Sequence, residues 1–263
     1  MRWPGFGGVT ISPYPRPNRV IWMSVANPIP RYLVTAGNTR EMIDRVRDWG
    51  NIFTGNTGFA IAQALAGNGA VDLLTSNLAH VDRAPAAGIT AAAFRSHADL
   101  MKLLKDRVTS TRYDAIFMTA AVADYTPAGS FAVLDRKKLP DGTEQWIVRD
   151  IHAGKIKSNH DAIAILGKQT KKIVDCFRAE WGYKGLLVKF KLEVGLSASQ
   201  LIEVGRRSRI ASGADYLIAN TLDMVQGASA GAYLISETGE EFVPRAQLAA
   251  RCARLVKESP QRR

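Results

Sequence analysis

The stretch that decides the fold is residues 31–58, which read RYLVTAGNTREMIDRVRDWGNIFTGNTG. It opens with an apolar run, turns at Gly37, and reaches a helix through the sequence Gly55-Asn56-Thr57-Gly58. A strand, a turn of small residues and a helix, in this order, form the first half of a nucleotide-binding βαβ unit. The segment lacks the G-x-G-x-x-G pattern. Its charged loop of about fifteen residues is of a length that is usually functional in a compact domain.

Composition limits the class of protein. The 263 residues, 46% of them hydrophobic, suit a soluble globular α/β protein with a sizeable core. No apolar run is long enough to span a bilayer, and the start shows no signal-peptide pattern. Cys176 and Cys252 are far apart in the sequence, so we expect no disulfide framework and a cytoplasmic location.

The net charge of +11 suits either nucleic acid or small anionic substrates. The basic residues are spread along the chain and are not interleaved with aromatic residues. Single-strand-binding proteins, in contrast, combine a basic groove with aromatic residues on which bases stack. We therefore favour phosphorylated small molecules as ligands and expect neither a nucleic-acid nor a membrane partner.

The periodicity along the chain predicts an α/β fold, a doubly wound, mostly parallel Rossmann-like sheet with an inserted β flap. Proline and glycine make residues 1–30 an irregular N-terminal arm, and residues 31–263 form a single domain. Strands are predicted at residues 32–35, 71–75, 115–119, 162–166, 186–190 and 216–219. Helices are predicted at residues 55–68, with Gly69 as C-cap, and at 97–109, 168–181, 199–212 and 247–257, and a hairpin at 233–243.

Residues 76–96 are predicted to be a loop with one extended piece. Residues 126–158 depart from the βα pattern, with short strands at 131–134 and 145–148 around a turn, and form the flap.

Candidate site residues gather at the predicted carboxyl edge of the sheet, where open α/β sheets bind ligands. Backbone N–H groups at Gly55, where a helix begins, suit a phosphate, although a helix start without a ligand is an equal alternative. Asp124 follows the small residues 120–123 and suits a ribose hydroxyl or a metal, or simply caps a turn. Lys155 suits a triphosphate, or lies on a wet edge strand.

Four other residues have a plain structural alternative that residue type alone favours. Arg40 and Arg47 suit bidentate binding of phosphate or carboxylate, and Asn51 suits an acyl-phosphate oxygen, but all three fit a solvated loop. Phe190 suits stacking on a base, but core packing is the favoured alternative.

Taken together, five motifs in order resemble the phosphopantothenoylcysteine synthetase family over roughly residues 31–257. The first is V-T-A-G-x-T-R-E-x-I/L-D, and the second is V-R-x-x-x-N-x-S-S-G-x-x-G. The others are A-A-V-A/S-D-Y/F, K-I-K/Q and F-K-L-E, with a later A-N. Here these patterns read VTAGNTREMID from Val34, VRDWGNIFTGNTG from Val46, AAVADY from Ala120, KIK from Lys155, FKLE from Phe190 and AN from Ala219.

The resemblance implies a ligase of coenzyme A biosynthesis that joins 4′-phosphopantothenate to L-cysteine through an acyl-nucleotidylate formed from CTP or ATP. It implies Mg²⁺, a homodimer made through the flap, and no flavin. It assigns catalysis to Asn51 and Lys155. Substrate binding falls to Gly37, Thr39, Arg40, Arg47, Thr54 and Gly55, and nucleotide binding to Ala120, Asp124, Lys155 and Phe190. Residues that would hold the metal are not identified.

The chain departs from the family pattern at Phe53, Thr54 and Asn56. The lysines that follow the Phe strand in CTP-using members fall at about Ser208 and Ser212, which leaves CTP and ATP open. The alternatives are a Rossmann protein that binds NAD(P), such as a reductase, and a non-catalytic nucleotide- or RNA-binding module.

Overall fold

The computed structural model describes residues 1, 29–151, 154–227 and 230–258. The predicted arm, apart from its first and last few residues, and residues 259–263 lie outside this described part.

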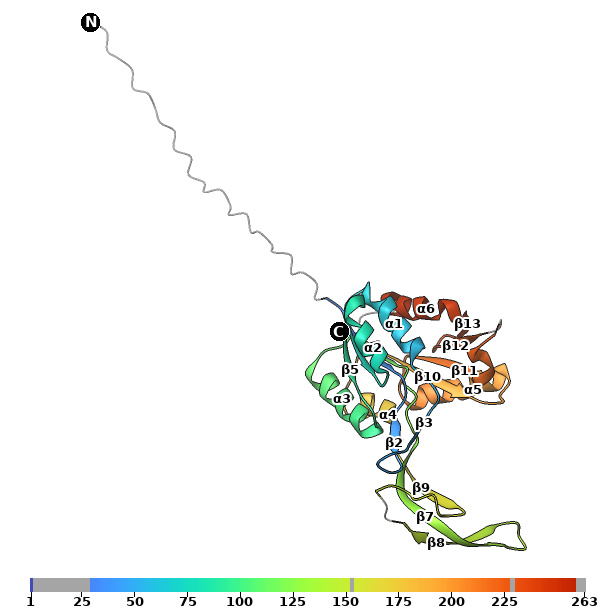
Figure 1. The fold of residues 1–263 in the computed structure, drawn as a ribbon. Coiled ribbons are helices and arrows are strands. Elements are labelled where there is room, and N and C mark those ends of the chain that lie inside the picture. Colours follow the sequence, from blue (N-terminus) through green and yellow to red (C-terminus); the bar gives the residue numbers. More distant parts are fainter. Residues whose placement is uncertain (2–28, 152–153, 228–229, 259–263) are drawn as a thin grey trace.

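A large sheet forms the body of the protein (Figure 1). It has eight strands, in the order β13-β12-β11-β10-β6-β1-β4-β5. Six of its strands are parallel: β1 (Arg31–Ala36), β4 (Ala70–Thr75), β5 (Ile89–Ala93), β6 (Ala115–Met118), β10 (Leu186–Glu193) and β11 (Tyr216–Thr221). The strands β12 (Gly231–Ile235) and β13 (Glu240–Pro244) continue the sheet in antiparallel fashion.

The chain runs outward from β1 through β4 and β5, then returns to the other side of β1 with β6, β10 and β11. This reversal makes the carboxyl ends of β1 and β6 the switch point at which doubly wound sheets bind their ligands. The predicted fold class is confirmed.

Helices cover both faces of the sheet. One face carries α1 (Asn56–Ala66), α2 (Leu78–Arg83) and α6 (Arg245–Glu258), and the other carries α3 (His97–Ser110), α4 (Ile173–Ala179) and α5 (Ala198–Ala211). Within β1, Val34 packs in the same core as Phe59, whereas Leu33 packs with Leu100 on the opposite face. Because β1 is covered on both sides, its residues are apolar almost throughout.

Several predicted boundaries were wrong. Residues 76–96 hold α2, the 3₁₀ turn η1 (Pro85–Ala87) and β5, because Asn77 caps a short helix by accepting from the N–H of Ala79 at 3.1 Å. The helix predicted at 168–181 is confined to α4. The helix α1 ends at Ala66, and its C-cap is Gly67 and not Gly69. The charged segment after β1, predicted to be irregular, contains the hairpin of β2 (Arg40–Met42) and β3 (Asp48–Gly50).

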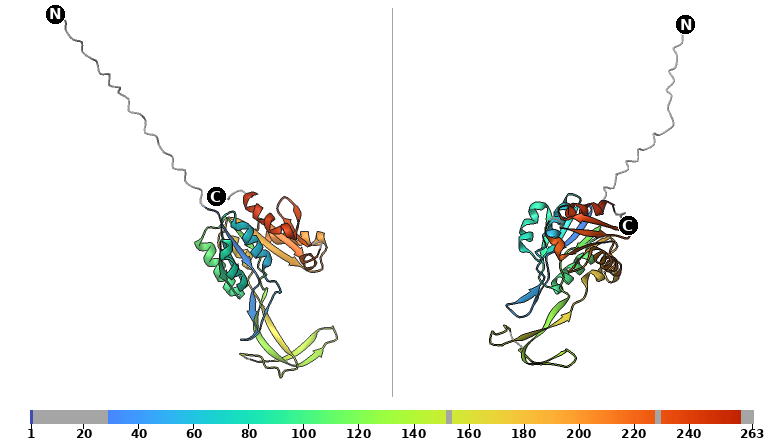
Figure 2. Two further views of the ribbon diagram at one scale, coloured as in Figure 1. Left: turned by 45° about the horizontal axis from the view of Figure 1, so that its top comes forward. Right: turned by 90° about the vertical axis from the view of Figure 1, so that its right-hand side faces the viewer.

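The flap is a three-stranded antiparallel sheet that leaves the body directly after β6 (Figures 1 and 2). Its strands are β7 (Tyr125–Lys138), β8 (Glu144–Asp150) and β9 (Ile163–Gln169). The βα pattern was predicted to resume at residue 162, but β9 pairs with β7 and belongs to the flap. The sequence of β9 is apolar enough to suggest a buried strand, although Ile163 and Leu166 are exposed.

Candidate functional site

A cavity of about 690 Å³ lies at the carboxyl ends of β1, β6, β10 and β11. Five residues predicted from the sequence line it: Gly37, Thr54, Gly55, Ala120 and Phe190. They come from segments far apart in the chain, and the switch point of the sheet brings them together.

The turn before α1 forms one wall of the cavity. Gly55 is the N-cap of α1 with φ 81°, and a Cβ on it would collide with the backbone of Gly37. Gly37 also has a positive φ, of 86°. Gly55 has no side chain with which to cap α1, so the first N–H groups of the helix suit an anion, which the helix dipole favours.

A polar network around the buried His80 supports this turn. The side-chain amide of Asn77 donates to the carbonyl of Thr54 at 3.1 Å, and Nε2 of His80 lies 3.1 Å from Oδ1 of Asn56. His80 is buried and stacks on Phe59 with 4.5 Å between ring centroids. Burial, and then the nearby Arg83, lower the pKa of His80, which favours the neutral imidazole.

Main-chain hydrogen bonds join the ends of β1 and β6. The N–H of Ala121 donates to the carbonyl of Gly37 at 2.8 Å, and the N–H of Ala120 donates to Oγ1 of Thr35 at 3.1 Å. Thr39 is buried, and its hydroxyl accepts from the N–H of Ala123 at 2.8 Å. In this structure Thr39 therefore braces the end of β6 and does not line the cavity.

Asn51 lies at the edge of this joined segment. The side-chain amide of Asn51 donates to the main-chain carbonyl of Ala121 at 3.4 Å. The main-chain carbonyl of Asn51 accepts from the side-chain amide of Asn38 at 2.6 Å. The exposed Asn51 side chain is thus adjacent to a cavity-lining residue.

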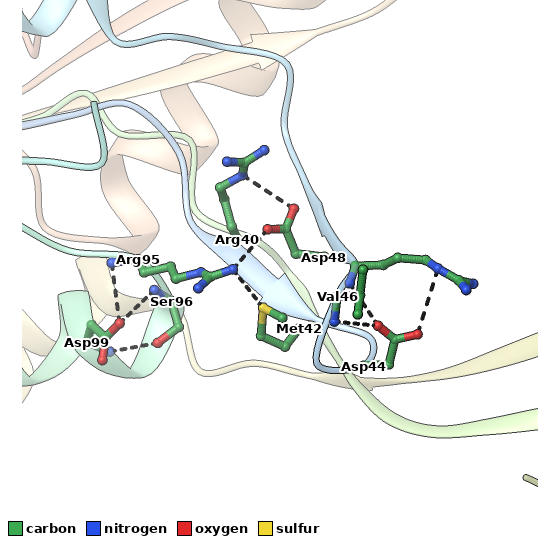
Figure 3. A network of polar contacts seen from close by, with 9 residues as sticks. Arg40, Met42, Asp44, Val46, Asp48, Arg95, Ser96 and Asp99 are labelled. Carbon is green, nitrogen blue, oxygen red and sulfur yellow. Dashed lines mark hydrogen bonds and ion pairs between the residues drawn. The ribbon is translucent and has the colours of Figure 1, made fainter. Parts of the chain in front are cut away.

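Four predicted site residues lie outside the cavity, toward the flap. Arg40 pairs with Asp48 at 3.3 Å, as Figure 3 shows, and Arg47 donates to the carbonyl of Ile156 at 2.6 Å. Asp124 immediately precedes β7, and its carbonyl accepts from the N–H of Thr170 at 2.9 Å. The remaining residue, Lys155, is exposed beside Ile156.

Sequence reasoning missed several polar residues that line the cavity, among them Asp223, Gln226 and Arg245. Asp223 belongs to the 3₁₀ turn η2 (Leu222–Val225), directly after β11, so the rule about strand ends would have found it. Arg245 begins α6, where the antiparallel hairpin returns the chain to this edge of the sheet. A cation at a helix N-terminus is unfavourable by itself, and an anionic ligand would offset that cost.

A second cavity, of about 810 Å³, lies at the opposite edge of the sheet, beside Asp114 before β6 and Asp215 before β11. It faces the amino ends of the parallel strands, where neither the α1 N-terminus nor the glycine turn is available. The carboxyl-edge cavity is therefore the better candidate, although it is the smaller of the two.

The sheet order defines a Rossmann-like α/β protein with a cavity at the switch point of the sheet. Residues 30–141 match the family model of the DNA/pantothenate metabolism flavoprotein C-terminal domain. This match confirms the family resemblance that the sequence motifs predicted.

Known proteins support this assignment. The coenzyme A biosynthesis bifunctional protein CoaBC of Thermococcus kodakarensis is 31% identical over 193 residues, which are 73% of this chain and 41% of that protein. The chain thus spans less than half the length of this curated relative. The crystal structure of the DNA/pantothenate metabolism flavoprotein from Streptococcus pneumoniae is 25% identical, with a TM-score of 0.72, and the match covers 88% of this chain and 99% of that one. A structure of a Cab2 mutant with phosphopantothenate-cysteine shares the fold, at 16% identity, 87% and 88% coverage and a TM-score of 0.60.

Among the described residues, no helix combines the length and the apolar character needed to cross a membrane.

Proposed function

We propose that this protein ligates 4′-phosphopantothenate to L-cysteine, through an acyl-nucleotidylate formed from CTP or ATP, in the cytoplasmic synthesis of coenzyme A. The observation that carries the proposal is the carboxyl-edge cavity, in which the glycine turn before α1 faces the same space as Ala120 and Phe190. The match to the family model and the resemblance to CoaBC support it.

The reaction has two steps. A carboxylate oxygen of phosphopantothenate attacks the α-phosphorus of the triphosphate, and pyrophosphate leaves. The cysteine amine then attacks the acyl carbon, loses a proton and displaces the nucleoside monophosphate. Both steps depend mainly on orientation and on stabilisation of negative charge, which preorganised backbone N–H groups and cations supply.

The cavity residues divide between two ligands. The N-terminus of α1, with Thr54 and Gly55, would hold the phosphate end of phosphopantothenate, and Asn51 would hold the acyl-nucleotidylate beside Ala121. Phe190 would stack on the base. The phosphates would meet Lys155, and Arg245 is a further cation on the cavity wall.

The donor set of the cavity fits a Mg²⁺ ion that arrives with the triphosphate. Mg²⁺ in such sites is commonly held by one or two carboxylates together with substrate phosphates. Asp223 is the carboxylate on the described cavity wall, and Asn220 and Gln226 add amide oxygens. When bound, the ion would neutralise phosphate charge.

The proposal includes a homodimer made through the flap. Large apolar side chains on the flap are exposed, namely Leu134, Trp146, Ile147 and Leu166. A second copy of the chain would cover them, because exposed apolar patches of this kind mark interaction sites. Lys155 lies outside the cavity of its own chain, and a dimer would let it serve the cavity of the other copy.

The test is pyrophosphate release from CTP and from ATP, with and without 4′-phosphopantothenate and cysteine. Release that requires phosphopantothenate supports the ligase. Hydride transfer to a nicotinamide, or RNA binding with no release, supports one of the alternatives and refutes the proposal.

A matched pair of variants tests the role of Asn51. Asn51→Asp places a negative charge where the acyl phosphate would lie, so we expect pyrophosphate release to fall while the fold is retained. Asn68→Asp makes the same change at the far end of α1 and serves as the control. Wild-type turnover by Asn51→Asp would remove Asn51 from the mechanism.

A further inference from the structure

Asp44 lies in the connection between β2 and β3, yet its side chain is fully buried, with 0% exposure. Its carboxylate accepts from the N–H of Val46 at 2.7 Å and of Arg47 at 2.8 Å, contacts that stabilise the turn (Figure 3). It also accepts from the N–H of Ile156 at 3.0 Å, 112 residues away in the sequence.

Further contacts from the same turn fix both neighbours of Lys155. Arg47 donates from Nη2 to the carbonyl of Ile156 at 2.6 Å, and the N–H of Arg45 donates to the carbonyl of Gly154 at 2.9 Å. The side chain of Ile156 is buried, with 2% exposure, whereas Lys155 itself is exposed. The backbone of Lys155 is therefore held on both sides, while its side chain remains in solvent.

We propose that Asp44 is a positioning residue that clamps the Lys155 segment onto the β2–β3 turn and so sets where the Lys155 ammonium is presented. The catalytic half of this inference rests on the proposed function, in which Lys155 meets the triphosphate. The clamp itself depends only on the hydrogen bonds between residues 44–47 and residues 154–156.

The charge state of Asp44 suits this role. The N–H of Ile156, and then that of Val46, lower the pKa of the Asp44 carboxyl, because each bond favours the ionised form. Hydrogen bonds to a charged group contribute more than neutral ones, and loss of this acceptor would leave the N–H of Ile156 without its partner.

The hairpin offers a matched control at Asp48. The Asp48 carboxylate pairs with Arg40 at 3.3 Å and with Arg95 at 3.4 Å, as Figure 3 shows. Neither contact involves residues 154–156. Removal of this second carboxylate thus perturbs the same hairpin without touching the clamp.

Limited proteolysis of the full chain by trypsin measures the clamp directly, because trypsin cuts after Lys155. Cleavage of a folded protein tracks the population of the open segment. Loss of a hydrogen bond to a charged group corresponds to about a tenfold change in that population. We expect Asp44→Asn to speed cleavage at Lys155 about tenfold or more, Arg47→Gln to speed it less, and Asp48→Asn to leave it within about twofold of wild type.

Mass spectrometry identifies the cleaved bond, and thermal melting shows that each variant is folded. Unchanged cleavage at Lys155 in both folded Asp44→Asn and Arg47→Gln would overturn the clamp, whatever the activity. Faster cleavage of these variants, in a protein whose wild type releases no pyrophosphate, would support the clamp and refute the proposed function.

A double-mutant cycle tests whether Asp44 acts through Lys155. If it does, adding Asp44→Asn to Lys155→Ala lowers pyrophosphate release no further than Lys155→Ala alone. Independent, multiplicative losses in the double variant would show that Asp44 acts by another route and would overturn the positioning role.

Discussion

The sharpest test of the site geometry is Gly55→Ala, at the glycine that begins α1. Gly55 has φ 81° and ψ 11°, a left-handed conformation. For a residue with a Cβ, that conformation costs roughly 1–2 kcal/mol.

The new methyl group would also collide with the backbone of Gly37. Two contacts hold Gly37 in place. Its carbonyl accepts from the N–H of Ala121 at 2.8 Å, and Ser76 lies so close that a Cβ on Gly37 would collide with it. Overpacking of this kind typically costs about 1–3 kcal/mol. The sum predicts a loss of about 2–5 kcal/mol in the free energy of unfolding.

The control is Gly67→Ala, at the other end of α1. Gly67 has φ −73°, a right-handed helical value, and no atom lies within 4 Å of an added Cβ. Alanine there reduces the entropy of the unfolded chain without strain, so we expect stabilisation by about 0.4–1 kcal/mol.

Urea unfolding followed by circular dichroism measures the free energy of unfolding of both variants, and thermal melting gives their melting temperatures. In a chain of this size each kcal/mol shifts the melting temperature by roughly 2–4 °C, so Gly55→Ala melts at least about 4 °C below wild type. The reasoning is refuted if Gly55→Ala stays within about 0.5 kcal/mol of wild type, or if Gly67→Ala is the more damaging change.

Three further predictions test the base contact, the buried histidine and the thiols. Phe190→Leu keeps an apolar side chain beside the core but removes the aromatic ring. We therefore expect KM for the triphosphate to rise roughly 5- to 150-fold while KM for phosphopantothenate stays unchanged. An unchanged KM for the triphosphate contradicts stacking on the base. The folded-state pKa of His80 lies below its ordinary 6.5, so the unfolded chain takes up the proton first and stability falls as pH drops below about 6.5. In urea titrations at pH 7 and pH 5.5 the loss is smaller for His80→Gln, and an equal loss contradicts the assignment. Burial raises the pKa of Cys252 to about 12 and also raises that of Cys176. We therefore expect both thiols to resist Ellman's reagent until the protein is unfolded. Rapid labelling of the native chain contradicts this expectation.

Much of the fold could be predicted because its signals are local. The apolar run of β1, the glycine turn and the helical spacing of α1 lie within residues 31–66, and each is encoded in consecutive residues. The order of small-residue strand ends likewise predicted that Gly37, Ala120 and Phe190 would share one edge of the sheet.

The flap shows where local signals fail. Residues 162–166 have the composition of a buried strand, but β9 pairs with β7 outside the body, with Ala132 opposite Ile163. Strand pairing depends on which distant partner is available, and hydrophobicity within one segment does not specify that partner.

The sequence by itself determined that the protein is a doubly wound α/β fold with a glycine turn at a helix start, since chain geometry and periodicity act over a few residues. Only the tertiary structure decided which polar residues of the first two motifs face the cavity and which contact the flap. Asp44 and Arg47 meet Ile156 across more than a hundred residues of chain. Such contacts depend on how the whole chain closes its long loops, and no local pattern encodes that closure.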